Sequence, residues 1–134
     1  MFRSIAIILF FAVHGIQATM DGDFGVWRVV AGLQICDSLH RCRQSYTITS
    51  DGNAENMLPA FSISATCFNL GGCEVDDIEP GLHLSNNCVP GSLSLTQTIA
   101  NATGYRAAWG SAPWRGGDWG EFTIPVSKLY IYGR

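Results

Sequence analysis

Residues 60–67 read AFSISATC and residues 92–99 read SLSLTQTI, and apolar and polar side chains alternate along both stretches. Successive side chains of an extended strand point to opposite faces, so this period of two indicates half-buried β-strands. The side chains expected to face the interior are Phe61, Ile63, Ala65 and Cys67 in the first stretch and Leu93, Leu95 and Ile99 in the second. The alternation predicts an all-β protein.

Further strand-like stretches lie on both sides of these two, and turn-forming residues separate them. The predicted additional strands are 26–31, 45–50, 74–78, 105–109, 122–126 and 128–132. The turn signals are Asp51-Gly52, Gly71-Gly72, Pro80-Gly81, Asn86-Asn87, Pro90-Gly91 and Gly116-Gly117. Short strands spaced by about 8–12 residues are typical of an antiparallel sandwich or barrel. Residues 37–43 are the only stretch after the N-terminal segment for which we expect a short helical turn.

The N-terminal segment, residues 1–18, reads MFRSIAIILFFAVHGIQA and has the layout of a signal peptide. Arg3 is followed by an apolar run of about nine residues, against the roughly 20 that a membrane-spanning helix needs. A retained anchor or a buried helix is the alternative. We expect cleavage after Ala18, which leaves residues 19–134 as one secreted, extracellular domain.

Five cysteines lie in the expected mature chain, and an oxidising compartment favours disulfides between them. The spacing of Cys36 from Cys42 and of Cys67 from Cys73 suits two local bridges. Cys88 would then be free or would link two chains in a homodimer, although a long-range bridge from it stays open. No His pair follows the Cys pairs, so the spacings do not fit a common zinc site.

The charge pattern argues against a nucleic-acid partner. The chain has eight Lys and Arg, one of them Arg3, against eleven Asp and Glu, and phosphate binding requires clustered basic side chains. We expect no cofactor and no metal. Asn101-Ala102-Thr103 is a glycosylation sequon that an exported chain would present to the modifying enzyme.

No set of residues forms a recognisable catalytic motif, so we predict a protein without enzymatic activity. His40 and His83 are the histidines beyond the signal peptide, and neither has the neighbours of a hydrolytic triad or of a phosphate-binding nuclease site. A cryptic hydrolase or ribonuclease is the least favoured alternative. The chain has one acidic run, which comprises Glu74, Asp76, Asp77 and Glu79. Such carboxylates could bind calcium, but the run lacks the EF-hand pattern, so we interpret it as a solvated strand edge.

Residues 109–120, WGSAPWRGGDWG, are the most distinctive segment and are predicted to form a loop. Tryptophan and arginine are enriched at binding hot spots, and loops lie at surfaces. The predicted partner contacts are Trp109, Trp114, Arg115, Asp118 and Trp119. The alternative is that the indoles fold back and plug one end of a barrel.

Several segments resemble the secreted fungal β-barrel family of the major Alternaria allergen. The similar segments are residues 22–29 (GDFGVWRV), 58–67 with Cys73, 92–99 and 105–108. The chain departs from that family in lacking its C-terminal disulfide and in having the Cys36/Cys42 pair. ToxA-like effector sandwiches share the same alternation and are the alternative fold family.

The resemblance implies a compact secreted barrel whose relatives are allergens, elicitors or effectors acting on plants. We therefore expect a secreted fungal effector or elicitor, virulence-associated or allergen-like, that binds a host protein or glycan outside the cell without inserting into a membrane. A carbohydrate-binding, lectin-like module that uses the same aromatic loop is the alternative.

Overall fold

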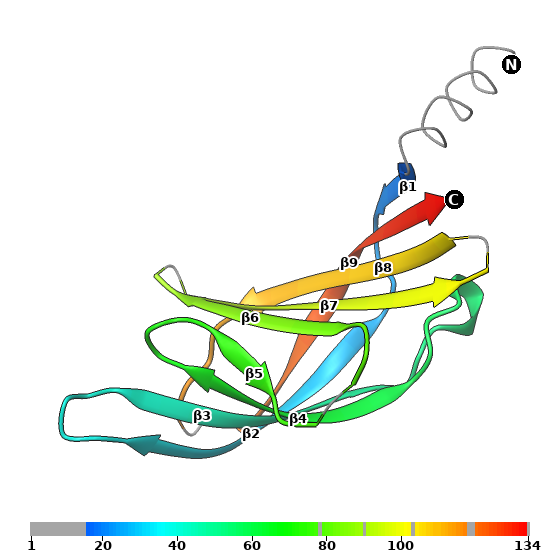
Figure 1. Cartoon of the computed structure of the whole chain (residues 1–134). Helices are drawn as coiled ribbons and strands as arrows, with labels where there is room; N and C mark the ends of the chain where they lie inside the picture. The colour runs from blue at the N-terminus through cyan, green and yellow to red at the C-terminus, as the bar shows by residue number, and fades with distance from the viewer. Residues whose placement is uncertain (1–15, 78, 90, 103, 118–119, 134) are drawn as a thin grey trace, which may run out of the picture.

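A computed structural model describes residues 16–77, 79–89, 91–102, 104–117 and 120–133 (Figure 1). Its regular elements are nine strands and one short 3₁₀ turn. They are β1 (Ile16–Asp21), β2 (Val26–Cys36), β3 (Cys42–Ser50), η1 (Ala54–Asn56), β4 (Phe61–Phe68), β5 (Cys73–Val75), β6 (Leu82–Cys88), β7 (Gly91–Asn101), β8 (Gly104–Pro113) and β9 (Glu121–Gly133). The predicted all-β class is confirmed.

The strands form one antiparallel sheet that curls into a nearly closed barrel, in the order β5-β4-β3-β2-β9-β8-β7-β6. Short β5 and the C-terminal part of β6 meet at the seam. Buried Asn86 closes this seam with its side chain and its backbone: the side-chain Nδ2 donates to the Phe68 carbonyl at 2.9 Å, and the backbone carbonyl accepts from Gly72 N at 3.2 Å. Asn86 and Asn87 were expected in a turn; that prediction is wrong, because both belong to β6.

Strand β9 belongs to both halves of the barrel. Its first part, from Glu121 to Pro125, pairs with β2, and its second part pairs with β1 on one edge and β8 on the other. The two strands predicted at 122–126 and 128–132 are therefore one. Pro125 lies within it, opposite Val26, and the ladder to β8 shifts register between Trp109 and Gly110 beside that position.

The core follows the alternation in the sequence. Five of the seven residues expected to face the interior are buried: Ile63, Ala65 and Cys67 of β4 and Leu93 and Leu95 of β7. The other two, Phe61 and Ile99, are only partly buried and pack against the core from its border. The other large, fully buried side chains are Trp27, Val29, Gln44, Tyr46, Ile48, Ile124 and Leu129. Burial of these apolar side chains is the main stabilising contribution.

Two predicted local structures differ from the observed ones. Residues 37–41 form a tight turn between β2 and β3 rather than a helical turn, and the Asp37 side chain accepts from the backbone N–H groups of Leu39 and Arg41 at 2.8 and 3.0 Å. Residues 109–113, expected in a loop, continue β8 because Gly110 packs against the Pro125 carbonyl where a side chain would not fit.

The expected cleavage position falls inside β1. Thr19, Met20 and Asp21 pair with β9 and would remain after cleavage, while residues 1–15 lie outside the described part of the chain. Within the described ranges, no helix has the length and apolar character required to cross a bilayer.

Candidate functional site

Residues 114–117, which follow β8, are fastened to the barrel by two buried side chains of β3. Tyr46 donates its hydroxyl to the Arg115 carbonyl at 2.5 Å, and Gln44 Oε1 accepts from Gly117 N at 2.9 Å. Burial raises the pKa of Tyr46 to about 12. These two bonds hold the backbone at Arg115 and Gly117 against β3.

Trp114 packs against the core, and its side chain is only partly exposed. Its ring lies so close to Gly116 that a side chain there would collide with it, and its Cβ approaches Gly91. The indole Nε1 is buried and has no hydrogen-bond partner among the described residues. Trp114 thus plugs the barrel end, as the alternative interpretation predicted for the whole set.

The other predicted contacts are divided between separate places. The Arg115 guanidinium lies 5.9 Å from the ring centroid of Phe122, and Phe122 in turn makes an edge contact with Tyr46. Asp118 and Trp119 lie outside the described residues. Trp109 is on β8, apart from the loop, so the structure does not bring it together with Trp114 and Arg115.

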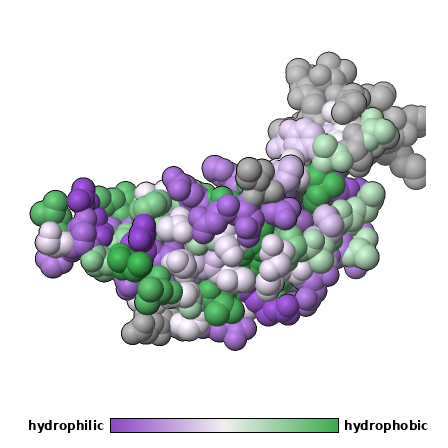
Figure 2. Space-filling model, turned by 60° about the horizontal axis from the view of Figure 1, so that its bottom comes forward, coloured by the Kyte–Doolittle hydropathy of each residue, from purple (hydrophilic) through white to green (hydrophobic). Residues whose placement is uncertain are grey.

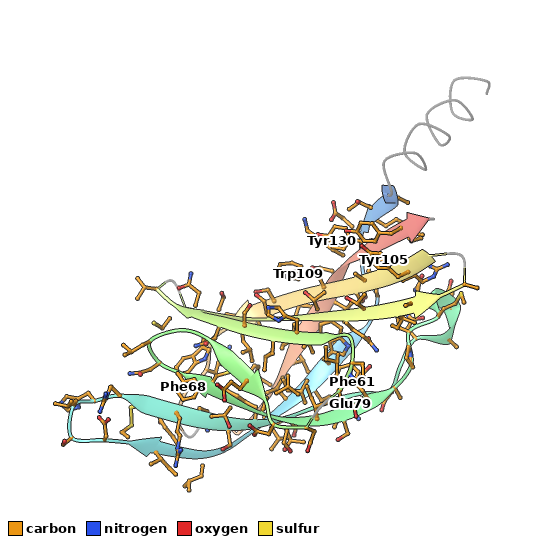
Figure 3. All side chains as sticks on the ribbon, viewed as in Figure 1. Phe61, Phe68, Glu79, Tyr105, Trp109 and Tyr130 are labelled. Atoms are coloured by element: carbon orange, nitrogen blue, oxygen red, sulfur yellow. A yellow bond between two sulfur atoms is a disulfide. The ribbon has the colours of Figure 1, made fainter. Side chains whose placement is uncertain are left out.

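Trp109 belongs to a cluster of aromatic side chains on the outer face of β8 and β9 (Figure 3). We call this cluster the aromatic face; it consists of Tyr105, Trp109, Tyr130 and Tyr132. Tyr105 and Tyr132 are cross-strand partners whose rings stack with centroids 4.4 Å apart and planes 18° from parallel. Tyr130 lies two residues before Tyr132, and their ring centroids are 6.4 Å apart.

Charged groups lie at one end of the aromatic face. The Lys128 ammonium is 6.0 Å from the Trp109 ring centroid and 3.7 Å from the carboxylate of Asp21 on β1. At the other end, partial burial, followed by the charges of Tyr105 and Tyr130, raises the pKa of Tyr132. The three phenol groups are thus close enough to influence one another.

Hydroxyl groups border the aromatic face on the β7 side. Thr96 pairs with Trp109, and Thr98 pairs with Ala107, which lies between Trp109 and Tyr105 along β8. Further along the same edge, Ser94 donates to Ser111 at 3.2 Å. The outer side of this half of the barrel therefore combines ring surfaces with short hydrogen-bonding side chains.

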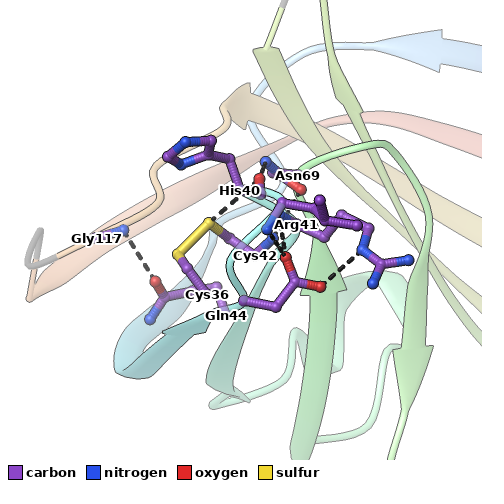
Figure 4. The surroundings of a disulfide bond; sticks show 9 residues. Cys36, His40, Arg41, Cys42, Gln44, Asn69 and Gly117 are labelled. Carbon is purple, nitrogen blue, oxygen red and sulfur yellow. Dashed lines mark hydrogen bonds and ion pairs between the residues drawn. A yellow bond between two sulfur atoms is a disulfide. The ribbon is translucent and has the colours of Figure 1, made fainter.

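The two predicted local disulfides, Cys36–Cys42 and Cys67–Cys73, are present, and Cys88 is unpaired within the chain. Asn69 lies in the loop closed by Cys67–Cys73 and binds the loop closed by Cys36–Cys42, beside which Figure 4 shows it. Its side-chain Oδ1 accepts from Cys42 N at 3.0 Å, its Nδ2 donates to the His40 carbonyl at 2.9 Å, and its backbone N–H donates to the Cys42 carbonyl at 3.0 Å.

The remaining candidates lie on separate elements. His40 is exposed at the β2–β3 turn, and His83 is exposed on β6, opposite Thr96. In the acidic run, Asp77 accepts from Ser64 N at 3.2 Å and Asp76 accepts from the Thr66 hydroxyl at 3.1 Å, so both carboxylates extend the edge of β4. Across the described ranges, no three His, Cys, Asp or Glu side chains gather as metal ligands.

The glycosylation prediction is only partly covered by the structure. Asn101 is the last residue of β7, its side chain is not among those described, and Thr103 lies outside the described residues.

Sequence reasoning missed Tyr105, Tyr130, Tyr132 and Lys128 as possible binding residues. Tyr130 and Tyr132 are two positions apart, which places them on one side of a strand. The alternation therefore indicates that Tyr130 and Tyr132 share one side of a strand, but it does not identify Tyr105 as their neighbour. The register that stacks Tyr105 on Tyr132 comes from the pairing of β8 with β9, which the spacing alone does not specify.

Comparison with protein-family models, with curated proteins and with solved structures finds no match for this chain.

Proposed function

We propose that this chain is a secreted binding protein of the effector or elicitor type, and that its aromatic face recognises a carbohydrate on the surface of a host. The observation that carries the proposal is the aromatic face itself, in which stacked Tyr105 and Tyr132 lie on the same side of the sheet as Trp109. The lectin-like alternative and the expected host contact thereby become one hypothesis.

The chemistry of this face suits a sugar. A pyranose ring has apolar C–H patches that pack on aromatic rings, and it carries hydroxyls that need hydrogen-bond partners. Phenol groups satisfy both needs, and the Thr96 and Thr98 hydroxyls border them. Tyr105 is 40% exposed, so the face is open to an extended chain.

Residue spacing adds a length requirement for the ligand. Tyr105 and Trp109 are four residues apart on β8, which is about 13 Å at the rise of an antiparallel strand. A single monosaccharide does not cover that span, so the proposal favours an oligosaccharide or polysaccharide.

The two disulfides support an extracellular setting, since such bridges persist in oxidising compartments. The signal peptide expected at residues 1–18 agrees with it.

The test is a binding assay of the purified protein against a panel of soluble and insoluble plant, fungal and animal polysaccharides. We expect one class to be retained, and we expect Tyr132→Ala and Trp109→Ala each to weaken that binding by about tenfold or more. Arg28→Ala is the matched control, because Arg28 is exposed on β2 and forms its ion pair with Asp51. A panel without any retained glycan, or retention unchanged in Tyr132→Ala/Trp109→Ala, would refute the assignment.

A further inference from the structure

A groove of about 570 Å³ lies at the disulfide end of the barrel, on β2, β3 and the β4–β5 turn. These elements do not carry the aromatic face, which is on β8 and β9. The groove is lined by Ile35, Cys36, Asp37, Arg41, Cys42, Arg43, Phe68, Asn69 and Leu70. Its volume falls within the range of small-molecule sites, which is about 300–1,000 Å³.

Apolar side chains form the walls of this groove. Ile35, Phe68 and Leu70 are 46%, 36% and 75% exposed, although most large apolar residues of the chain are buried or partly buried. Figure 2 shows hydrophobic surface at the end of the molecule that carries the β2–β3 hairpin. Covering such a surface with an apolar ligand releases it from water and is favourable.

The uncompensated charge in the groove is positive. The only carboxylate in its lining, Asp37, binds the Arg41 Nε at 2.7 Å and two backbone N–H groups of its own turn. These bonds lower the pKa of Asp37, the backbone bond from Arg41 most, so it stays ionised and balances Arg41. Arg43 forms no ion pair with any residue in the described ranges.

Register places this charge between apolar neighbours. Ile35, Arg43 and Phe68 are consecutive cross-strand partners on β2, β3 and β4, so the stem of Arg43 lies between two hydrophobic side chains. A cation at the centre of an apolar row complements a ligand with one anionic group and a hydrocarbon body.

The groove is also preformed. Each of its two loops is closed by a disulfide, and the three hydrogen bonds of Asn69 hold one loop against the other. A rigid site loses less conformational entropy on binding than a mobile one.

We propose that this groove binds a single-chain anionic amphiphile of the long-chain fatty acid class. The carboxylate pairs with Arg43, and the hydrocarbon chain covers Ile35, Phe68 and Leu70. This site is separate from the aromatic face, and the proposal does not depend on carbohydrate binding.

The test measures displacement of a dansyl-labelled fatty acid from the oxidised protein by palmitate and by hexadecanol, each below its critical aggregation concentration. We expect palmitate to bind at least about tenfold more tightly than the alcohol, and Arg43→Gln to remove that difference while leaving the alcohol unaffected. Phe68→Ser should weaken both ligands. Arg28→Gln is the matched control, because that arginine lies outside the groove and should change neither affinity.

Four results would overturn the proposal. One is equal affinity for acid and alcohol in the wild-type protein, and another is an unchanged acid affinity in Arg43→Gln. The third is binding to vesicles that contain anionic phospholipid without any binding of monomeric palmitate, which would make a bilayer surface the occupant. Tyr132→Ala should leave palmitate binding intact; loss of binding in that variant would move the site to the aromatic face.

Discussion

At the scale of single residues, Tyr46 links the core to the β8–β9 loop, and its titration should be visible in the stability of the protein. Its pKa is about 12 in the folded state and about 10 in an unfolded chain, so the folded state holds the phenol proton more tightly. The stabilisation is complete below pH 10 and is lost as the pH rises through 12. Denaturant titrations between pH 8 and 12 should show this decline in the wild-type protein.

Tyr46→Phe provides the matched comparison. It removes the hydroxyl that donates to Arg115 O, which should lower the free energy of unfolding by about 1 kcal/mol at neutral pH. It should also flatten the loss of stability between pH 10 and 12. An equally steep alkaline loss in the variant would show that other groups control it.

The variant Trp114→Ala tests whether the Trp114 side chain stabilises the core or contacts a partner. Because the indole packs on the core, we expect the substitution to lower the free energy of unfolding by about 2 kcal/mol, measured by thermal or chemical denaturation. Arg115→Ala serves as the neighbouring substitution. If Trp114→Ala keeps wild-type stability and loses a partner, then the loop is a contact site after all.

The predicted tryptophan loop shows what single-residue reasoning supplies. Composition marks Trp109 and Trp114 as large aromatic side chains, suited either to the core or to a contact surface. Composition carries no information on where each ring points, and one is a core plug while the other lies on an outer face. That difference is determined by β8 extending to Pro113.

At the scale of elements, the two disulfides close loops of equal length but differ in their surroundings. Both join cysteines six residues apart, so the chain-entropy contribution of each is similar, about 2 kcal/mol. Cys67 is fully buried, whereas Cys36 is exposed at the end of a hairpin. We expect Cys67→Ala/Cys73→Ala to reduce the melting temperature more than Cys36→Ala/Cys42→Ala, as measured by calorimetry.

The pair of double variants also separates stability from binding. Cys36→Ala/Cys42→Ala should retain the barrel, judged by its circular dichroism, and weaken palmitate binding because one wall of the groove is released. Equal losses of melting temperature in the two variants would argue against the role of burial.

The elements themselves were largely predictable. Alternation identified β4 and β7 because each has one buried and one exposed face, and local spacing identified both disulfides. The turn predicted at Asn86-Asn87 was wrong. Asparagine is typical of turns, but the Asn86 side-chain amide donates a hydrogen bond across the barrel seam. The pattern also divided β9 at Ser127 into strands 122–126 and 128–132, although residues 121–133 form one strand that pairs with β2 in its first part and with β1 and β8 in its second.

At the scale of the whole molecule, the barrel depends on its seam. Asn86→Ala removes the donor to the Phe68 carbonyl at the point where β6 meets the β4–β5 turn. We expect about 1–3 kcal/mol lower stability and faster amide exchange at Gly72, measured by hydrogen exchange. Asn87→Ala, at the exposed neighbouring position, is the control and should leave exchange at Gly72 unchanged.

The proposed export can be tested by the chemical changes that it should leave on the molecule. Expressed through a eukaryotic secretory pathway, the chain should begin at Thr19 and carry one glycan, which Asn101→Gln would remove. Intact-mass spectrometry of the secreted protein before and after glycosidase treatment measures both. A protein that starts at Met1 and has no added mass would contradict the signal peptide and the sequon together.

The place of β9 at the end of the described chain has a consequence for biosynthesis. Because β1, β2 and β8 all pair with this strand, neither half of the barrel is complete until residues 121–133 have left the ribosome. The hairpins that carry Cys36–Cys42 and Cys67–Cys73 can form earlier, because the two strands of each hairpin are adjacent in the sequence. In a chain exported as we propose, oxidation of these cysteines should therefore precede barrel closure, and Asn101 should meet the modifying enzyme while its surroundings are still unfolded.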